Sequence, residues 1–472
     1  MPDVTSLFRV PWPWRWRVLI TLALYAAYLP LSGYGPGQFR FDAAEYWELS
    51  LKFTPPGGFS VLAFDEPLRG YLGPLLVLPG RLLCHVTGWP MLTGARVLGA
   101  GWAALLFGLA IPALWARTTG RALGGGRWLG LLGLGFIFWR DYFNFTLSDM
   151  PALTLLLLGL AALGRRSWRW AGIAGLLLAA SINIRPIYLG CLPGVLWLLA
   201  DNGRQLSRQQ LAKLLAAVVA GAALVLLPQL LINQRHFGQA TPLVLAQRPG
   251  KEPLYLRQLA WGTAFQRYET SLVPAIPRSL VYADSVGQRA LAAMPGGRFS
   301  SYEGFLKFLT QNPVSCTARY ARHLFNGLDI RYPTPYPTRL HPPGQAGLQL
   351  LNYALLGLGL WLALPHRRAA RQQPPLTDAP VTASPTAVLL ALLLPCLLAL
   401  PTLMECRFLL PLHLLLLTGI AATWRPLAWW RSLLGTGRRV AILALAAGWF
   451  WGCWQLSEAT AGQLRPPSEA PR

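Results

Sequence analysis

The chain has 472 residues, of which 54% are hydrophobic and only 13% are charged, whereas about 25% of residues are charged in an average soluble protein. This composition excludes a disordered chain, a coiled coil and a disulfide scaffold, and the 20 Trp, 40 Pro and 46 Gly are typical of a membrane protein. The net charge of +24 would suit a nucleic-acid partner, but the placement of the basic residues indicates a different cause.

Eleven stretches of the chain are apolar and approach the roughly 20 residues that a membrane-crossing helix needs. We expect spans near 17–35, 92–115, 128–143, 150–164, 170–183, 186–200, 211–232, 346–364, 386–404, 407–424 and 440–456. The first follows Arg9, Arg15 and Arg17 as the core of a signal peptide would, but ten more spans follow it, so we interpret it as an uncleaved anchor. The predicted fold class is an all-α polytopic membrane protein.

The distribution of charge predicts the orientation of these spans. With the N-terminus in the cytoplasm, the inner segments are 1–16, 116–127, 165–169, 201–210, 365–385 and 425–439. Arginines crowd these segments, while only three of the 18 acidic residues lie there, namely Asp3, Asp201 and Asp378. This pattern follows the positive-inside rule, so the excess positive charge is a topology signal and an attraction to anionic lipids. We therefore expect membrane lipids, and no nucleic acid, among the partners.

Residues 71–90 are also apolar, but a span there would place the next Arg-rich loop on the outer side, against the rule. The stretch is interrupted by Pro74, Pro79, Arg81 and His85. We predict that it forms an amphipathic helix lying on the outer membrane surface.

Two large outer segments result, at 36–91 and 233–345. The second is too long for a bare connection, so we expect it to be functional or to fold into a small layer. The predicted division of the chain is a transmembrane module over 1–232, the outer segment 233–345 and C-terminal helices over 346–472.

The first polar motif follows the first span, at FRFDAAEYWELS (39–50). Asp42 and Glu45 are three residues apart and would share one face of a helix, with Tyr46 beside them. One interpretation is a capping box, with Asp42 as the helix N-cap and Glu45 at the third position. The other is a catalytic carboxylate at the membrane surface, where it can meet both a lipid-borne donor and a soluble acceptor.

A second polar group is expected where the third and fourth spans meet, at Arg140, Asp141, Asn144, Ser148 and Asp149. Asp149 followed by Pro151 is a good helix start, and Arg140 with Asp141 would make a simple ion pair. Because these groups fall at the same depth as the first outer loop, we also expect them to share a cavity with it.

Two arginines interrupt apolar runs at the outer side. Arg185 precedes Pro186, and Arg407 lies two residues after Glu405. An arginine near the bilayer interior costs about 2.5–3.5 kcal/mol on insertion scales, so each should face protein, water or an anion. A phosphate group suits the guanidinium fork, while Arg185 at the headgroups and a mutual Glu405–Arg407 pair are the simpler alternatives.

The outer segment also offers histidines. His236 and His341, with Glu45, are the candidate ligands for a divalent metal ion, but their spacing does not require one, and an ordinary surface role is the more frequent one for such histidines. The sequence predicts no other cofactor.

Taken together, these motifs resemble the GT-C superfamily of integral membrane glycosyltransferases, above all bacterial relatives of protein O-mannosyltransferases and of the lipid A aminoarabinose transferase. The resemblance rests on the order of short segments: FRFDAAEYWELS, PLRGYLGPLLVLPGRLL (67–83), TGARVLGAGWAALL (93–106), SDMPALTLLLLGL (148–160), the Arg185–Pro186 step, NQRHFG (233–238) and MECRFLLPLHLLL (404–416). It covers most of 17–240 and then 403–417, and it departs from the family in separating the two acids by two alanines.

The resemblance implies a helical bundle with amphipathic helices in the first outer loop. It also implies an enzyme that moves a sugar from a polyprenyl-phosphate donor to a lipid, glycan or protein acceptor with inversion, at the periplasmic face of a bacterial inner membrane. Asp42 would be the base, and Arg185 and Arg407 would stabilise the phosphate charge. Glu405 would orient Arg407, and Glu45, Tyr46, Arg140 and Asp149 would line the substrate site.

A transporter or flippase for a lipid-linked saccharide is the alternative from another class. Transporters place ionisable groups near the bilayer midplane, often on broken helices. The charges of this chain fall mostly at one face, around the two outer segments, and this favours the enzyme.

Overall fold

The computed structural model describes residues 10–165, 167–204, 206–363, 383–423 and 436–465. The chain is mostly helical, as predicted, but it also contains a small three-stranded sheet that the all-α expectation did not include. The expected inner segments 365–385 and 425–439 lie largely outside the described residues.

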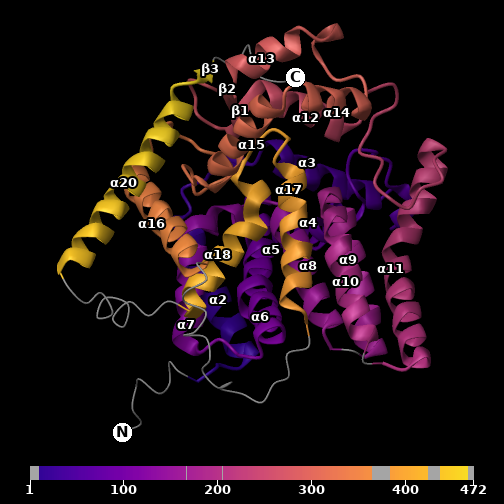
Figure 1. The fold of residues 1–472 in the computed structure, drawn as a ribbon. Helices are drawn as coiled ribbons and strands as arrows, with labels where there is room; N and C mark the ends of the chain where they lie inside the picture. Colours follow the sequence, from indigo (N-terminus) through magenta and orange to yellow (C-terminus); the bar gives the residue numbers. More distant parts are fainter. Residues whose placement is uncertain (1–9, 166, 205, 364–382, 424–435, 466–472) are drawn as a thin grey trace. The chain divides into compact units, whose positions relative to one another are not determined.

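Internal contacts divide the chain into two compact units, whose boundaries differ from the expected division. Unit 1 comprises residues 1–126, 139–254 and 375–398, and unit 2 comprises 127–138, 255–374 and 399–472. The helices of unit 1 are α2 (Trp14–Tyr28), α3 (Phe41–Leu49), α4 (Leu72–Thr87), α5 (Met91–Leu105), α6 (Ile111–Thr119), α8 (Asp149–Leu163), α9 (Trp168–Ile184), α10 (Leu192–Gly203), α11 (Arg208–Phe237) and most of α17 (Pro385–Ala399) (Figure 1).

Unit 2 contains both helices and the sheet. Its helices are most of α7 (Gly125–Trp139) and α12 (Leu254–Ala264), then α13 (Ser285–Ala292), α14 (Tyr302–Gln311), α15 (Pro313–Leu328), α16 (Gln345–Ala363), α18 (Leu410–Thr423) and α20 (Thr436–Ala461). The strands are β1 (Phe265–Ser271), β2 (Arg278–Ala283) and β3 (Leu464–Arg465), in the antiparallel order β1-β2-β3.

Five helical stretches among the described residues are long and apolar enough to cross a membrane. They are Met91–Thr119, Arg208–Phe237, Gln345–Ala363, Cys406–Thr423 and Val440–Ala461. Four shorter apolar helices accompany them, α4, α8, α9 and α17. These helices are compatible with an integral membrane protein, but the expected count of eleven spans is not confirmed, because several predicted spans form helices of only 12–17 residues.

Glycines allow the helices of unit 1 to approach closely. A Cβ atom at Gly175 on α9 would lie 2.0 Å from the carbonyl oxygen of Val218 on α11. A Cβ atom at Gly221 on α11 would lie 1.9 Å from the carbonyl oxygen of Gly172 on α9. Small residues at such positions are the usual basis of helix packing in membranes, where no hydrophobic force drives helices together.

Two glycines on α5 give a matched test of this packing. A Cβ atom at Gly99 would lie 1.7 Å from the carbonyl oxygen of Phe143, whereas one at Gly101 would meet nothing within 4 Å. We expect Gly99→Ala to lower the free energy of unfolding by about 1–3 kcal/mol through overpacking. Gly101→Ala should leave it unchanged or raise it, because alanine favours helix. Thermal unfolding of the purified protein measures both, and equal melting temperatures for the two variants would contradict the packing.

A buried histidine in unit 2 predicts a pH dependence of stability. His323 on α15 places Nδ1 2.6 Å from the carbonyl oxygen of Leu400 and Nε2 3.2 Å from that of Phe265. Burial lowers the pKa of His323 to about 4, although the two carbonyl groups favour the charged form. The unfolded chain, with a histidine pKa of about 6.5, therefore binds more protons between pH 6.5 and 4.

Protonation of His323 therefore does not lower the free energy of unfolding above pH 6.5. As the pH falls from 6.5 towards 4, it lowers the free energy of unfolding by about 3 kcal/mol in all. Chemical unfolding of the wild type and of His323→Gln across this range measures the difference. The stability of the variant should fall less steeply with acid, and parallel curves would show that His323 does not titrate in this way.

Candidate functional site

The acidic motif forms a charged cluster on α3. Nη2 of Arg69 donates to Oδ1 of Asp42 at 3.0 Å and to Oε2 of Glu45 at 3.0 Å. The guanidinium group also stacks 5.2 Å from the ring centre of Tyr46. Burial disfavours the charge on Arg69, but Tyr46, Asp42 and Glu45 outweigh it and raise the pKa of Arg69 above its ordinary value. Asp42 and Glu45 therefore lie on the same face of α3, as expected, and Arg69 binds both carboxylates.

The capping-box interpretation of this motif is wrong. The N-cap residue of α3 is Arg40, whose side chain makes no capping hydrogen bond, and Asp42 lies within the first turn. Phe41, directly before Asp42, has a φ of 57°, in the left-handed region that non-glycine residues seldom adopt. Such a conformation costs about 1–3 kcal/mol and clusters at functional sites. The local backbone thus favours a functional interpretation of Asp42 over a structural one.

Arg69 was not among the predicted site residues, and contacts distant in sequence fix its position. A Cβ atom at the next residue, Gly70, would lie 1.9 Å from the carbonyl oxygen of Asn183. The Asn183 side chain accepts from Leu72 N at 3.0 Å and donates to Gln229 at 2.8 Å. Only glycine permits this approach, so the segment that carries Arg69 is held against α9 and α11.

A second charged pair joins Asp149 and Arg185. Asp149 begins α8, as the helix-start interpretation predicted, and its buried carboxylate is ion-paired with Nη1 of Arg185. Arg185 lies between α9 and the short 3-10 helix Pro186–Cys191, and its side chain is 17% exposed. The phosphate role of Arg185 stays a prediction.

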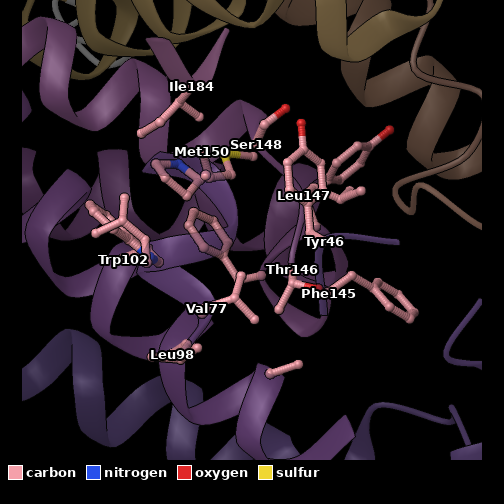
Figure 2. Close-up of a pocket in the computed structure, with 17 residues that line it drawn as sticks. Tyr46, Val77, Leu98, Trp102, Phe145, Thr146, Leu147, Ser148, Met150 and Ile184 are labelled. Atoms are coloured by element: carbon pink, nitrogen blue, oxygen red, sulfur yellow. The ribbon is translucent and has the colours of Figure 1, made fainter. Parts of the chain in front are cut away.

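A cavity in unit 1 lies beside both charged groups. It is small, with an interior volume of about 30 Å³, and its wall is mainly apolar. Tyr46 lines it from the acidic cluster, while Ser148 and Ile184, the neighbours of Asp149 and Arg185, line it from the second pair. Figure 2 shows these side chains around the cavity together with Val77, Leu98, Trp102 and Met150. The arrangement provides carboxylates and guanidinium groups next to an apolar chamber.

The expected polar group at residues 140–144 forms a separate cluster. Asp141 is buried and accepts hydrogen bonds from the hydroxyl group of Tyr28 and, at 3.0 Å, from Nδ2 of Asn144. Arg140 stacks 5.4 Å from the ring centre of Tyr28. The cavity wall includes the adjacent Tyr142 and Phe143, but Arg140, Asp141 and Asn144 are not among the residues that line it.

Glu405 and Arg407 pair with each other in unit 2, as the simpler alternative predicted. Nε of Arg407 donates to Oε2 of Glu405 at 2.7 Å, and Nη2 donates to Oε1 at 3.1 Å. Both side chains are about nine-tenths buried. A two-pronged pair of this kind fixes the plane of the guanidinium group.

The candidate metal ligands receive no support from the structure. Glu45 is engaged by Arg69, Nε2 of His236 lies 2.8 Å from the carbonyl oxygen of Leu62, and His341 is exposed in unit 2. In the part of the chain that the structure describes, no group of three or more His, Cys, Asp or Glu side chains is arranged to hold a metal ion.

Comparisons with known proteins add no relative. No protein-family model, no curated protein and no solved structure matches the chain.

Proposed function

We propose that the protein is a glycosyltransferase that moves a sugar from a polyprenyl-phosphate donor to a lipid, glycan or protein acceptor at the outer face of the membrane. The observation that carries the proposal is the Asp42–Glu45–Arg69 cluster, which follows a strained Phe41 and adjoins, through Tyr46, an apolar cavity. Transfer from a lipid-linked donor needs this combination, because an apolar chain and a charged reaction centre must lie side by side.

The proposed reaction gives a role to Asp42 and to Arg185. An acceptor hydroxyl or amine attacks the anomeric carbon while Asp42 takes its proton, the bond between that carbon and the phosphate oxygen breaks, and polyprenyl phosphate leaves. The attack comes from the side opposite the leaving group, so the anomeric configuration is inverted. Arg185 stabilises the charge that develops on the phosphate, as a fixed cation does in a site that excludes water.

The remaining predicted residues of this unit bind the substrates. Glu45, Tyr46, Arg140 and Asp149 contact the sugar or the acceptor. The GT-C resemblance and the charge distribution of the sequence support a periplasmic site in a bacterial inner membrane.

A transfer assay tests the proposal. Purified protein is mixed with a panel of radiolabelled polyprenyl-phosphate sugars and a membrane extract as acceptor, and label in the acceptor fraction is counted. Transfer that requires both protein and donor supports the proposal. If no donor is consumed but labelled lipid crosses the bilayer of vesicles containing the protein, the flippase alternative replaces it.

A further inference from the structure

Arg69 lies on a stretch of chain that has no regular structure of its own. Residues 64–70 form neither helix nor strand, yet Arg69 binds both carboxylates of α3. Helix α3 is attached separately, because Oγ1 of Thr146 donates to the carbonyl oxygen of Ala43 at 2.6 Å. The position of the guanidinium group must therefore come from contacts between its stretch and other parts of the chain.

Three buried amide side chains form a continuous row beside this stretch. Asn183, near the end of α9, donates from Nδ2 to Oε1 of Gln229 on α11 at 2.8 Å. Gln229 donates from Nε2 to Oδ1 of Asn233, about one turn later on the same helix, at 2.9 Å. The three residues are at most 2% exposed, and they lie in unit 1 together with Arg69 and α3. We refer to them as the amide row.

One end of the amide row holds the chain directly after Arg69. Oδ1 of Asn183 accepts from Leu72 N at 3.0 Å, and Oε1 of Gln229 accepts from Tyr71 N at 3.4 Å. A backbone N–H group can only donate, so these two contacts determine which way both amide groups point. The start of α4, two residues after the arginine, is thereby fixed to α9 and α11.

The other end of the amide row holds the chain before Arg69 through the segment that follows α11. Nδ2 of Asn233 donates to the carbonyl oxygens of Thr241 at 2.7 Å and Leu243 at 2.8 Å. Three residues further on, Ala246 N donates to the carbonyl oxygen of Pro67 at 2.9 Å. The stretch is thus held two residues before the arginine as well as two residues after it.

The amide row is not needed to join α9 to α11. The two helices already approach closely at Gly175 and Gly221. Of the hydrogen bonds named above, the one from Asn183 to Gln229 runs between these helices, and most of the others end on backbone groups outside them. Buried amides are costly unless their groups are paired, and here each oxygen and each nitrogen of the row has a partner. The row is therefore directed at the chain around Arg69.

We propose that the amide row positions Arg69, and through it the carboxylate of Asp42, for the transfer reaction, with Gln229 as the central positioning residue. This inference rests on the proposed function, which assigns Asp42 as the base. A chain held on both sides of Arg69 keeps its Nη2 at 3.0 Å from Asp42 and from Glu45. If Arg69 moves, Asp42 loses this partner, and a misplacement of about 1 Å can lower a catalysed rate by about 10²-fold.

Gln229→Met keeps the approximate length of the side chain and removes its hydrogen bonds. We expect kcat to fall about tenfold and the KM for the donor to stay within about twofold, because the base is displaced while the donor contacts persist. Gln234→Met is the matched control, since it makes the same substitution at an exposed position of α11 and should change neither constant.

A double-mutant cycle shows whether Gln229 acts through Arg69. In an Arg69→Met background, Gln229→Met should lower kcat by less than about twofold, because the effects of residues that act through one another are not additive. Equal effects of Gln229→Met in the two backgrounds, or an unchanged kcat in the single variant at equal amounts of folded protein, overturn the positioning role.

Asn233→Ala is the second variant, for the case that Gln229→Met does not fold. It detaches Thr241 and Leu243 from the row, keeps the contacts at Tyr71 and Leu72, and introduces a residue that favours helix. We expect kcat to fall about threefold with the KM for the donor unchanged. An unchanged kcat in this variant contradicts the proposal.

Hydrogen–deuterium exchange separates this inference from the proposed function, because it needs no turnover. In Gln229→Met, the peptides covering 67–72 and 241–246 should exchange faster than in the wild type and in Gln234→Met. Unchanged exchange overturns the positioning of Arg69 even in a protein that transfers sugar. Faster exchange in a protein that consumes no donor retains the link between the amide row and Arg69 and overturns its role in transfer.

Discussion

Replacement of Asp42 by Asn should lower the rate of sugar transfer by about 10²–10⁴-fold, the usual contribution of a general base. The amide has nearly the same size, but it cannot accept the proton of the attacking group. Its oxygen can still accept the hydrogen bond from Nη2 of Arg69, so the fold should persist. Initial rates at saturating donor, measured at equal amounts of folded protein, give the effect.

Glu45→Gln is the matched control, because Arg69 holds both carboxylates and only Asp42 follows the strained Phe41. We expect it to raise the KM for one substrate and to leave most of kcat. If Glu45→Gln abolishes transfer and Asp42→Asn does not, Glu45 is the base and the assignment within the cluster must be exchanged.

Replacement of Arg267 by Met should lower the free energy of unfolding by about 3–5 kcal/mol, the usual result of removing one partner from a buried ion pair. Methionine fills a similar volume, so the loss comes from charge and not from a cavity. Glu269 and Asp329 both lose the guanidinium group that balances them, and both are almost fully buried. Thermal or urea unfolding in detergent measures the change.

Arg322→Met is the control for this experiment. Arg322 is paired with Asp284 at 2.9 Å in the same unit, but its side chain is 41% exposed and Asp284 keeps a second partner in Arg319. The expected loss is at most about 1 kcal/mol. Equal losses for Arg267→Met and Arg322→Met would show that Arg267, Glu269 and Asp329 do not act as a buried network.

The part of the site that the sequence predicts is local in the chain. Helical spacing places Asp42 and Glu45 on one face, the Asp149–Pro151 pattern predicts the start of α8, and Glu405 and Arg407 pair over two residues. Residues 71–90 were predicted to form a helix, and α4 covers most of them, because Pro74 lies in the first turn of a helix that Gly88 ends.

The parts that the sequence does not reveal depend on distant partners. In the sequence, nothing distinguishes Arg69 from other arginines in an amphipathic stretch. Its position is fixed by the close approach of Gly70 to Asn183, more than 100 residues later in the chain. Arg267 and Glu269 look like the solvated face of a strand, because alternation with Gln266 and Tyr268 does not say which face is buried. The hydrogen bond from Arg267 to Asp329, 62 residues later in the chain, identifies the charged face as the buried one.

Contacts between distant residues also set the order in which the three-stranded sheet and the contacts of Asp329 can form during synthesis. Asp329 lies 128 residues before Ser457, its hydrogen-bond partner. Strand β2 pairs with β3, which consists of Leu464 and Arg465 and is made much later. Contacts of such long range close late and slow folding, since the loop entropy is lost before the contact forms. Arg267 and Asp329 leave the ribosome well before Ser457 and β3, so the hydrogen bond to Ser457 and the three-stranded sheet are complete only after α20 has been made.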